Sequence, residues 1–347
     1  MTIKQPVGVV AAISPWNFPA CLGVQACAPA IVAGCTVVHK PAQDTPLTSL
    51  ALAYLAEKAG LPPGVLNVLT CENPTAVGEE LSTNPLVNKL TFTGSTAVGK
   101  LLASQAASTV KRVSLELGGN CPFLIFADAN LEDAIEKAFM TKFYNAGQVC
   151  NGINRFLVED SIYDEVVEKF TQKAKTLKLG SGRNPMTTLG PVINQAAVRK
   201  VQRLVDEAQK KGAILVMGGT AESLLYEPTI LKDVPTNAAL YHEEIFGPVA
   251  AFYRFKTEKE AIHMANDTVY GLAAYVFTNN FERIRRLSAA LEAGSVGINT
   301  TGIFREMAPF GGFKQSGIGR EGGVVGSLDH YYEVKAITLG AGNVPEK

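Results

Sequence analysis

The chain opens with short apolar runs that alternate with longer segments of helical spacing. Residues 7–13 form a continuous valine-rich run, which is typical of a strand buried on both faces, and residues 36–40 and 87–94 repeat this pattern. Helical spacing follows in residues 46–60 and again in residues 96–108. Strands that alternate with helices predict parallel βαβ units and therefore an α/β fold.

The first of these helices is expected to start at Pro46 and to stop at Gly60, because proline suits the first turn and glycine suits the end. Five apolar residues fall on one side of it at helical spacing: Leu47, Leu50, Ala51, Tyr54 and Leu55. This pattern predicts an amphipathic helix.

A second alternation begins after a strand in residues 113–120. Residues 131–144 have helical spacing and stop at Asn145-Ala146-Gly147, with a buried side predicted for Leu131, Ala134, Ile135, Ala138 and Phe139. Further helices are expected near residues 162–177, 195–211, 257–266 and 280–293, and a strand is expected in residues 294–299. The glycine-rich residues 309–323 predict a loop, and residues 330–340 predict a late strand.

Composition narrows the class of protein. The 347 residues include 32 basic and 32 acidic side chains, so charge favours neither nucleic acid nor an anionic membrane as a partner. A hydrophobic content of 47% is enough to form a large core, and the length of the chain predicts two domains. Apolar stretches of roughly 20 residues, which a bilayer requires, do not occur, and the first twenty residues do not resemble a signal peptide.

Six cysteines lack the paired spacing of zinc sites and the density of a disulfide scaffold, so we predict no metal site and a reducing, cytoplasmic setting. Cys21, Cys27, Cys35 and Cys121 lie among apolar residues and are expected to be buried and inert. Cys150 differs, because it follows a predicted helix end in the small, polar run NAGQVCNG. Such a loop presents a thiol to a reactant.

A carboxylate is a reasonable helper for that thiol. Glu116 ends an apolar strand just before Gly118-Gly119 and could accept a proton directly or through water. A structural glutamate remains the alternative. A cysteine–histidine hydrolase is a competing interpretation, with His39, His242, His263 or His330 as the base. His39 falls in a predicted buried strand and His263 in a predicted helix, so neither is an obvious partner.

Three further positions suit ligand binding. Asn17 stands between two prolines in SPWNFP, so its amide is either a rigid oxyanion donor or an ordinary turn residue. Gly94 and Gly99 join a strand to a helix, which suits a phosphate but lacks the dinucleotide fingerprint. Lys40 emerges at the carboxyl end of a predicted parallel strand, where such sheets bind ligands.

The order of eight motifs resembles the aldehyde dehydrogenase superfamily from residue 6 to about residue 335. The motifs are SPWNFP, HKPAQDTP, AGLPPGVLNV, FTGST, LELGGN, NAGQVC, EEIFGPV and PFGGFKQSGIGRE. Residues 297–323 and 329–340 are most similar to the succinate-semialdehyde dehydrogenase branch. The resemblance implies oxidation of an aldehyde through a cysteine thiohemiacetal and a thioester, with NADP or NAD as the cofactor.

The resemblance also implies roles for individual residues. Cys150 would be the nucleophile, Glu116 the base for the deacylating water, and Asn17, with the backbone N–H of Cys150, the oxyanion donor. Residues implied at the cofactor are Trp16, Lys40, Gln43, Gly94, Ser95, Gly99, Leu117, Glu244 and Phe246.

Two departures bear on the ligands. Tyr144 stands where the branch usually has an arginine for the substrate carboxylate, and Arg305 in a nearby loop is the candidate replacement, with a solvated loop arginine as the alternative. Gly152 replaces a frequent second cysteine. Gln43 stands where NAD-preferring relatives often have a glutamate that repels a 2′-phosphate, so we expect NADP to be accepted.

The implied fold is an aldehyde dehydrogenase-like α/β architecture. Residues 1–118 would form part of a Rossmann-type NAD(P)-binding domain, residues 119–315 the catalytic domain, and residues 316–347 a C-terminal segment that returns to the cofactor domain and ends in an oligomerisation strand. Family members have on the order of a hundred or more residues ahead of this start, so an N-terminal segment is expected to be missing.

The leading hypothesis is therefore an NAD(P)-dependent dehydrogenase of succinate semialdehyde or a similar small semialdehyde, assembled as a homodimer or homotetramer. A cysteine-dependent esterase and a shortened nucleotide-binding or assembly subunit are the alternatives. A coenzyme-A-acylating enzyme is disfavoured because Glu116 is present to assist hydrolysis.

Overall fold

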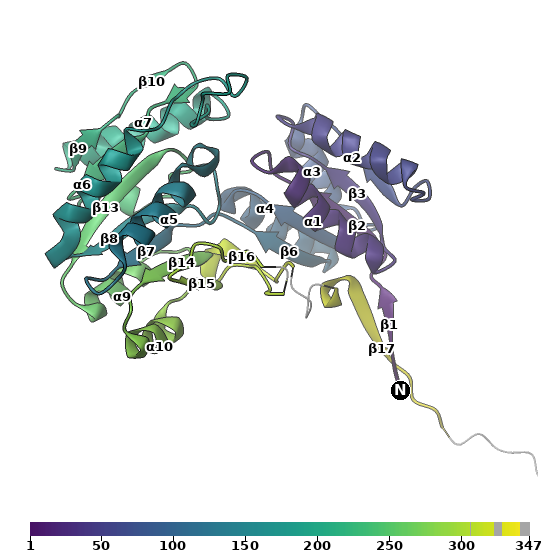
Figure 1. Ribbon diagram of the computed structural model, residues 1–347. Helices are drawn as coiled ribbons and strands as arrows, with labels where there is room; N and C mark the ends of the chain where they lie inside the picture. Colours follow the sequence, from purple (N-terminus) through teal and green to yellow (C-terminus); the bar gives the residue numbers. More distant parts are fainter. Residues whose placement is uncertain (306, 323–327, 341–347) are drawn as a thin grey trace, which may run out of the picture. The chain divides into compact units, whose positions relative to one another are not determined.

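The computed structural model describes residues 1–305, 307–322 and 328–340, and the chain divides into two compact units. Unit 1 comprises Met1–Leu115, Glu306–Pro309 and Gly319–Lys347, and unit 2 comprises Glu116–Arg305 and Phe310–Ile318. Figure 1 colours most of unit 1 purple to blue and most of unit 2 teal to green.

Unit 1 is built on a sheet whose strands follow one another in the order β6-β5-β2-β3-β4. Strand β2 pairs in parallel with β3 and β5, and β3 pairs in parallel with β4. The strands are β2 (Val9–Ile13), β3 (Thr36–Lys40), β4 (Leu66–Val68), β5 (Lys89–Thr93) and β6 (Arg112–Glu116), and the helices are α1 (Pro19–Val32), α2 (Pro46–Lys58), α3 (Pro74–Thr83) and α4 (Thr96–Ala106).

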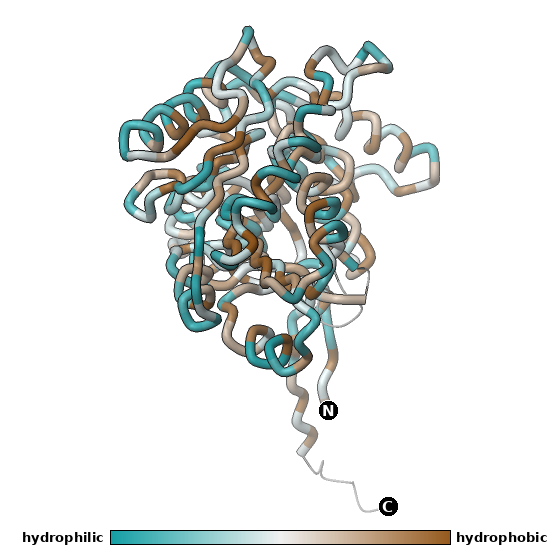
Figure 2. Tube along the Cα trace, turned by 60° about the vertical axis from the view of Figure 1, so that its left-hand side comes forward, coloured by the Kyte–Doolittle hydropathy of each residue, from teal (hydrophilic) through white to brown (hydrophobic). Residues whose placement is uncertain are grey.

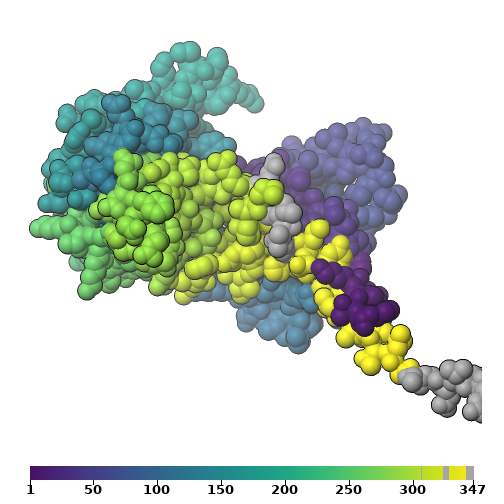
Figure 3. Space-filling view, turned by 60° about the horizontal axis from the view of Figure 1, so that its bottom comes forward, coloured from purple at the N-terminus to yellow at the C-terminus, as the bar shows by residue number. Residues whose placement is uncertain are grey.

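The two ends of unit 1 form a separate two-stranded ribbon. Strand β1 (Thr2–Pro6) pairs antiparallel with β17 (Tyr332–Ala336), and Figure 3 shows the purple N-terminal strand beside the yellow C-terminal one. An ion pair between Lys4 and Asp329 and another between Arg112 and Glu333 fix the C-terminal strand further. The predicted late strand is therefore present.

Unit 2 contains a seven-stranded sheet in the order β15-β14-β7-β8-β13-β12-β9. Neighbouring strands are parallel except β9 and β12. The strands are β7 (Cys121–Ile125), β8 (Ile153–Glu159), β9 (Ile214–Met217), β12 (Thr229–Lys232), β13 (Val249–Phe255), β14 (Ala273–Phe277) and β15 (Ser295–Ile298), with a short hairpin of β10 (Ala221–Glu222) and β11 (Leu225–Tyr226).

Helices cover this sheet, and alternate strand residues point into two hydrophobic clusters on its two faces, with Leu124 in one and Phe123 in the other. The helices are α5 (Leu131–Phe143), α6 (Tyr163–Ala174), α7 (Gln195–Lys210), α8 (Ala239–His242), α9 (Glu258–Asn266) and α10 (Phe281–Ala290). Figure 2 shows apolar and polar residues alternating along the helices, as expected for elements with one buried side. The predicted α/β fold class is confirmed.

Helix α2 forms where expected, and its apolar side is exposed, with Leu47 at 76% and Leu55 at 59%. One prediction of burial is wrong. Cys21 is exposed near the start of α1, whereas Cys27, Cys35 and Cys121 are buried as expected. Periodicity therefore located the helix without showing what its apolar side contacts. Within the described ranges, no helix is long and apolar enough to cross a membrane.

Candidate active site and nucleotide cavity

Cys150 lies in a sharply turned loop of unit 2 between α5 and β8. After α5 the backbone takes positive φ angles at Asn145 (49°), Ala146 (55°) and Gly147 (72°). A Cβ atom on Gly147 would lie 2.1 Å from the carbonyl oxygen of Gly247, so glycine is required there. These turns leave the Cys150 side chain half-buried at the start of the segment that enters β8.

Gln148 fastens this loop to a neighbouring segment. Its side chain is buried, its Oε1 accepts the Ile193 N–H at 2.8 Å, and its Nε2 donates to the Asn145 carbonyl at 2.9 Å. The oxygen of this amide therefore bonds to a neighbouring segment, and its nitrogen bonds to a residue of the loop itself. The glutamine of the NAGQVC motif therefore has a structural task beside the reactive cysteine.

Burial raises the pKa of the Cys150 thiol above its usual range, and the negative charges of Glu116 and Glu244 and the nearby Cys121 raise it further. The thiol therefore stays protonated near neutral pH, and attack on a carbonyl needs a proton acceptor. The charged groups acting on this thiol are carboxylates rather than histidines, which disfavours the cysteine–histidine hydrolase.

Alkylation of Cys150 is expected to accelerate with pH without levelling off below about pH 9, because its raised pKa keeps the thiolate a minor form there. In this range the thiolate fraction rises about tenfold per pH unit. The check is the rate of iodoacetamide labelling of the Cys150 peptide, followed by mass spectrometry. The exposed Cys21 provides the internal control, and a plateau for Cys150 near neutral pH would contradict the expectation.

Three of the motifs meet within unit 2. Glu116 ends β6 and is 5% exposed, and the next residues make close contacts that only glycine permits. A Cβ atom on Gly118 would lie 2.7 Å from Glu244 Oε2, and one on Gly119 would lie 2.4 Å from the Cys150 carbonyl oxygen. The two glycines of LELGGN therefore let the carboxylate of EEIFGP and the loop of NAGQVC approach the same turn.

Hydrogen bonds hold the same turn. The Leu117 N–H donates to the Ser316 carbonyl and the Gly119 N–H donates to Glu244 Oε1, at 2.9 and 3.0 Å. Burial raises the pKa of the Glu244 carboxyl, while the Gly119 N–H and the Lys200 charge act in the opposite direction. Phe246, two residues further on, is half-buried with a φ of 54°.

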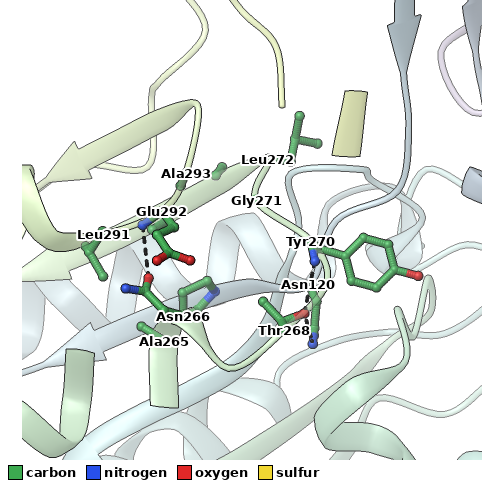
Figure 4. A pocket seen from close by; sticks show the side chains of 13 residues that line it. Asn120, Ala265, Asn266, Thr268, Tyr270, Gly271, Leu272, Leu291, Glu292 and Ala293 are labelled. Atoms are coloured by element: carbon green, nitrogen blue, oxygen red, sulfur yellow. Dashed lines mark hydrogen bonds between the residues drawn. The ribbon is translucent and has the colours of Figure 1, made fainter. Parts of the chain in front are cut away.

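Asn120 anchors the far end of this turn. Its Nδ2 donates to the Tyr241 carbonyl at 2.8 Å and to Thr268 Oγ1 at 3.3 Å, and Figure 4 shows Asn120 directed toward Thr268. The pocket drawn there, which Asn266 and Glu292 also line, has a volume of about 10 Å³. This volume is about that of a single water position, so the pocket cannot hold an organic substrate.

The two substrate candidates are both solvent-exposed. Tyr144 follows α5 and is 61% exposed, and Arg305 is exposed at the end of the segment that follows β15. A Cβ atom on Gly302 would lie 3.4 Å from an Arg305 guanidinium nitrogen, so the arginine folds back toward its own loop.

Unit 1 contains a cavity of about 430 Å³ at the carboxyl ends of β2, β3 and β5. Predicted cofactor residues in its lining are Trp16, Lys40, Gln43, Gly94 and Ser95. Gly99 is buried in α4, whose N-terminus is capped by Ser95 Oγ accepting the Val98 N–H at 3.4 Å. Position and size match the place where parallel sheets bind nucleotides.

Lys40 and Asn17 are both buried in unit 1. Lys40 Nζ donates to the Pro41 carbonyl at 3.1 Å, and burial lowers the pKa of its ammonium group. Gln43 is exposed beside them. The predicted site residues thus fall into two groups. Asn17 and the residues of the cavity belong to unit 1. The group in unit 2 consists of Cys150, Glu116, Leu117, Glu244, Phe246, Tyr144 and Arg305.

The sequence analysis did not predict the residues that α3 and α4 contribute to the lining of the cavity. On α4 they lie along one side of the helix and are Val98, Leu101, Leu102 and Gln105. Their i, i+3, i+4, i+7 spacing is visible in the sequence, but the same spacing also describes a side packed on a core. In the portion of the chain that the structure describes, no group of three or more His, Cys, Asp or Glu side chains could hold a metal ion.

The fold and these two sites define a class of protein. The Aldehyde dehydrogenase family matches residues 1–337, and the chain belongs to this family. It is 53% identical over 343 residues to the mitochondrial succinate-semialdehyde dehydrogenase of Arabidopsis thaliana, with 98% of this chain and 65% of that protein covered. It is 50% identical to a succinate-semialdehyde dehydrogenase [NADP(+)] of Escherichia coli, with 98% and 71% covered.

Other relatives extend this similarity. A glutarate-semialdehyde dehydrogenase of Pseudomonas putida is 49% identical, with 98% of this chain and 70% of that protein covered. The crystal structure of an NADP-dependent enzyme of E. coli is 51% identical with a TM-score of 0.94, covering 96% of this chain and 70% of that one. These findings confirm the predicted family. The chain spans about two thirds of the length of the relatives it matches, with 65% of the first and 71% of the second covered.

Proposed function

We propose that this chain carries the nucleotide-binding and catalytic parts of an NAD(P)-dependent dehydrogenase of succinate semialdehyde or a similar small semialdehyde. The observation that carries the proposal is the meeting of the Cys150 loop with Glu116 and Glu244 in unit 2. The names of the relatives support a semialdehyde substrate.

The reaction follows from the chemistry of a thiol held beside carboxylates. Cys150 Sγ gives its proton to a water molecule and attacks the aldehyde carbon, which yields a thiohemiacetal whose oxyanion needs hydrogen-bond donors. We assign these to the Asn17 side chain and the Cys150 backbone N–H. A nicotinamide held there would supply the hydride acceptor for oxidation of the thiohemiacetal, which would leave a thioester on Cys150.

Glu116 completes the turnover as the general base. It removes a proton from water, the water oxygen bonds to the thioester carbon, and the carbon–sulfur bond breaks to release the carboxylate and the Cys150 thiol. Glu116 suits this task because it is buried and its charge already acts on Cys150. The second carboxylate, Glu244, is tied to the Gly119 N–H and is therefore less free to move a proton.

The cavity of unit 1 fits the adenosine and phosphate part of a dinucleotide by size and by lining. Its volume of about 430 Å³ lies in the usual range for ligand pockets, and it combines the aromatic side chain of Trp16 with the helix N-terminus at Ser95. We propose that Trp16 and Lys40 contact the adenosine ribose, and that Gly94 and Ser95, with Gly99 packed beneath them, contact phosphate. Leu117, Glu244 and Phe246 are assigned to the nicotinamide and its ribose.

This assignment gives each unit a task. We propose that residues 1–118 bind the cofactor, residues 119–315 carry the chemistry, and residues 316–347 return to the cofactor domain and serve assembly as a homodimer or homotetramer. Part of the last segment, residues 323–327 and 341–347, lies outside the described residues. Support for assembly comes from the ribbon of β1 and β17, whose residues are largely exposed.

Arg305 is our candidate ligand for the substrate carboxylate, because a guanidinium binds a carboxylate through two parallel hydrogen bonds. Tyr144 is the candidate partner, since its exposed hydroxyl could donate to the same group. We further propose a cytoplasmic location, which six free cysteines support.

The test is formation of reduced nicotinamide by the purified chain with succinate semialdehyde, with NAD and NADP supplied separately. Aldehyde-dependent reduction supports the proposal. A folded chain that binds nucleotide and yet reduces it with none of several small aldehydes would refute it for this chain.

Gln43→Glu is expected to raise the KM for NADP by about tenfold and to change the KM for NAD by less than about threefold. The new carboxylate would stand beside the 2′-phosphate of NADP. Repulsion between two like charges about 4 Å apart costs roughly 1 kcal/mol or more. The matched control is Gln105→Glu, which adds the same charge at the α4 side of the cavity. Equal effects on both cofactors would show that Gln43 does not read the 2′ position.

A further inference from the structure

Three backbone carbonyls around Cys150 each accept a hydrogen bond from a buried side chain. The Cys150 carbonyl accepts from Cys121 Sγ at 3.7 Å, and the Asn151 carbonyl accepts from the Tyr275 hydroxyl at 2.8 Å. The Ile153 carbonyl accepts from Lys142 Nζ at 2.9 Å. The donors come from β7, β14 and α5, so three separate elements bond to three residues of the segment 150–153.

Tyr275 is suited to be a permanent donor. Its side chain has no exposed surface, and its ring packs near that of Phe123, with 6.1 Å between the ring centroids. Burial raises the pKa of its hydroxyl well above the usual range, so the proton stays on the oxygen throughout the working pH range. A buried hydroxyl is costly unless it is hydrogen-bonded, and the Asn151 carbonyl satisfies it.

Lys142 closes the loop from its other side. It lies in the last turn of α5 and is 1% exposed, and its bond to Ile153 joins the residue before the loop to the residue that follows it. Burial lowers the pKa of its ammonium group to about 7. Among the ion pairs of the described residues, none includes Lys142. A buried amine whose hydrogen bond goes to a backbone carbonyl is suited to positioning that backbone.

We propose that Tyr275 and Lys142 are positioning residues that hold the backbone on either side of Cys150, so that Sγ stays in its half-buried place, where the charges of Glu116 and Glu244 act on it. The inference rests on the proposed role of Cys150 as the nucleophile. Neither side chain needs to touch the substrate. Each acts through the loop, so its loss should alter the reactivity of one sulfur rather than the affinity for ligands.

The experiment compares Tyr275→Phe and Lys142→Met with the control Tyr253→Phe. Tyr253 is also a buried tyrosine of the same sheet, on β13, and its hydroxyl has no hydrogen-bond partner within the described part of the chain. Each variant is measured for kcat, KM, Tm and the rate of iodoacetamide labelling of Cys150 as a function of pH. Tyr275→Phe removes a single oxygen atom, which keeps the packing.

We expect kcat to fall about ten- to a hundredfold in Tyr275→Phe and Lys142→Met, with KM within about threefold of the unchanged chain. Labelling of Cys150 should become severalfold faster and should shift to lower pH, because a loosened loop lets the thiol leave its burial and the two carboxylates. Tyr253→Phe should match the unchanged chain in all three.

A lower Tm with unchanged kcat and an unchanged labelling profile in both variants would overturn the proposal, because a purely structural bond has that signature. The labelling readout needs no substrate or cofactor. A chain that lacks dehydrogenase activity but shows the shifted labelling would therefore refute the proposed function and still support the positioning role.

Discussion

Cys150→Ala is expected to lower the rate of nicotinamide reduction by about 10³-fold or more, because no thiohemiacetal or thioester can form without the sulfur. Alanine is smaller and apolar, and the loop is held by the backbone bonds to Tyr275 and Lys142, so folding should be retained. The measurement is the initial rate with succinate semialdehyde, together with the Tm of the variant.

Nucleotide binding serves as the companion measurement. The cavity belongs to unit 1 and Cys150 to unit 2, so the Kd for NADP should change by less than about threefold. Cys21→Ala is the matched control, since this thiol is exposed on α1 and should leave the rate unchanged. Reduction that survives in Cys150→Ala would show that another group carries the chemistry.

Glu116→Gln is expected to separate the two halves of the reaction. The amide fills the same space but cannot accept a proton from water, so hydrolysis of the thioester should slow by about 10²- to 10³-fold. Removing this charge also removes one cause of the raised pKa of Cys150, which favours the thiolate. Rapid mixing should therefore show a burst of about one equivalent of reduced nicotinamide, followed by slow turnover.

Two outcomes would contradict this assignment. Unchanged steady-state turnover in Glu116→Gln would mean that another group activates the water. A loss of the burst itself would place Glu116 in the first half of the reaction, as the acceptor of the thiol proton. Glu222→Gln, an exposed change on β10, is the control for a nonspecific effect of lost charge.

Sequence reasoning located elements better than it located contacts. The valine-rich run of residues 7–13 predicted β2, and helical spacing predicted α5 with its buried Ala134, Ile135 and Ala138. Helix α1 was missed because it is apolar on most sides, carries no charge and contains Pro29, so it has no polar stripe to reveal its period. A local sequence pattern predicts which residues are buried only when one side of a helix or strand differs in polarity from the other.

The candidate site shows the same limit. Cys150 stood out as a candidate because a thiol in a polar turn is locally unusual, whereas the role predicted for Glu116 depended on the family resemblance. The reason for two successive glycines was hidden, because Gly118 and Gly119 make room for Glu244 and for the Cys150 carbonyl, which are distant in the sequence. The contacts of Tyr275 and Lys142 with the Cys150 loop could not be predicted either, because each residue looks like an ordinary member of a strand or a helix.

The single tryptophan of the chain is Trp16, and it lines the cavity of unit 1. All tryptophan emission of this protein therefore originates beside the place where a nucleotide is proposed to bind. A dinucleotide that enters the cavity changes the polarity and the quenchers around that one indole, and no other indole dilutes the signal. The protein thus contains its own optical probe, which can report occupancy of unit 1 independently of any chemistry at Cys150.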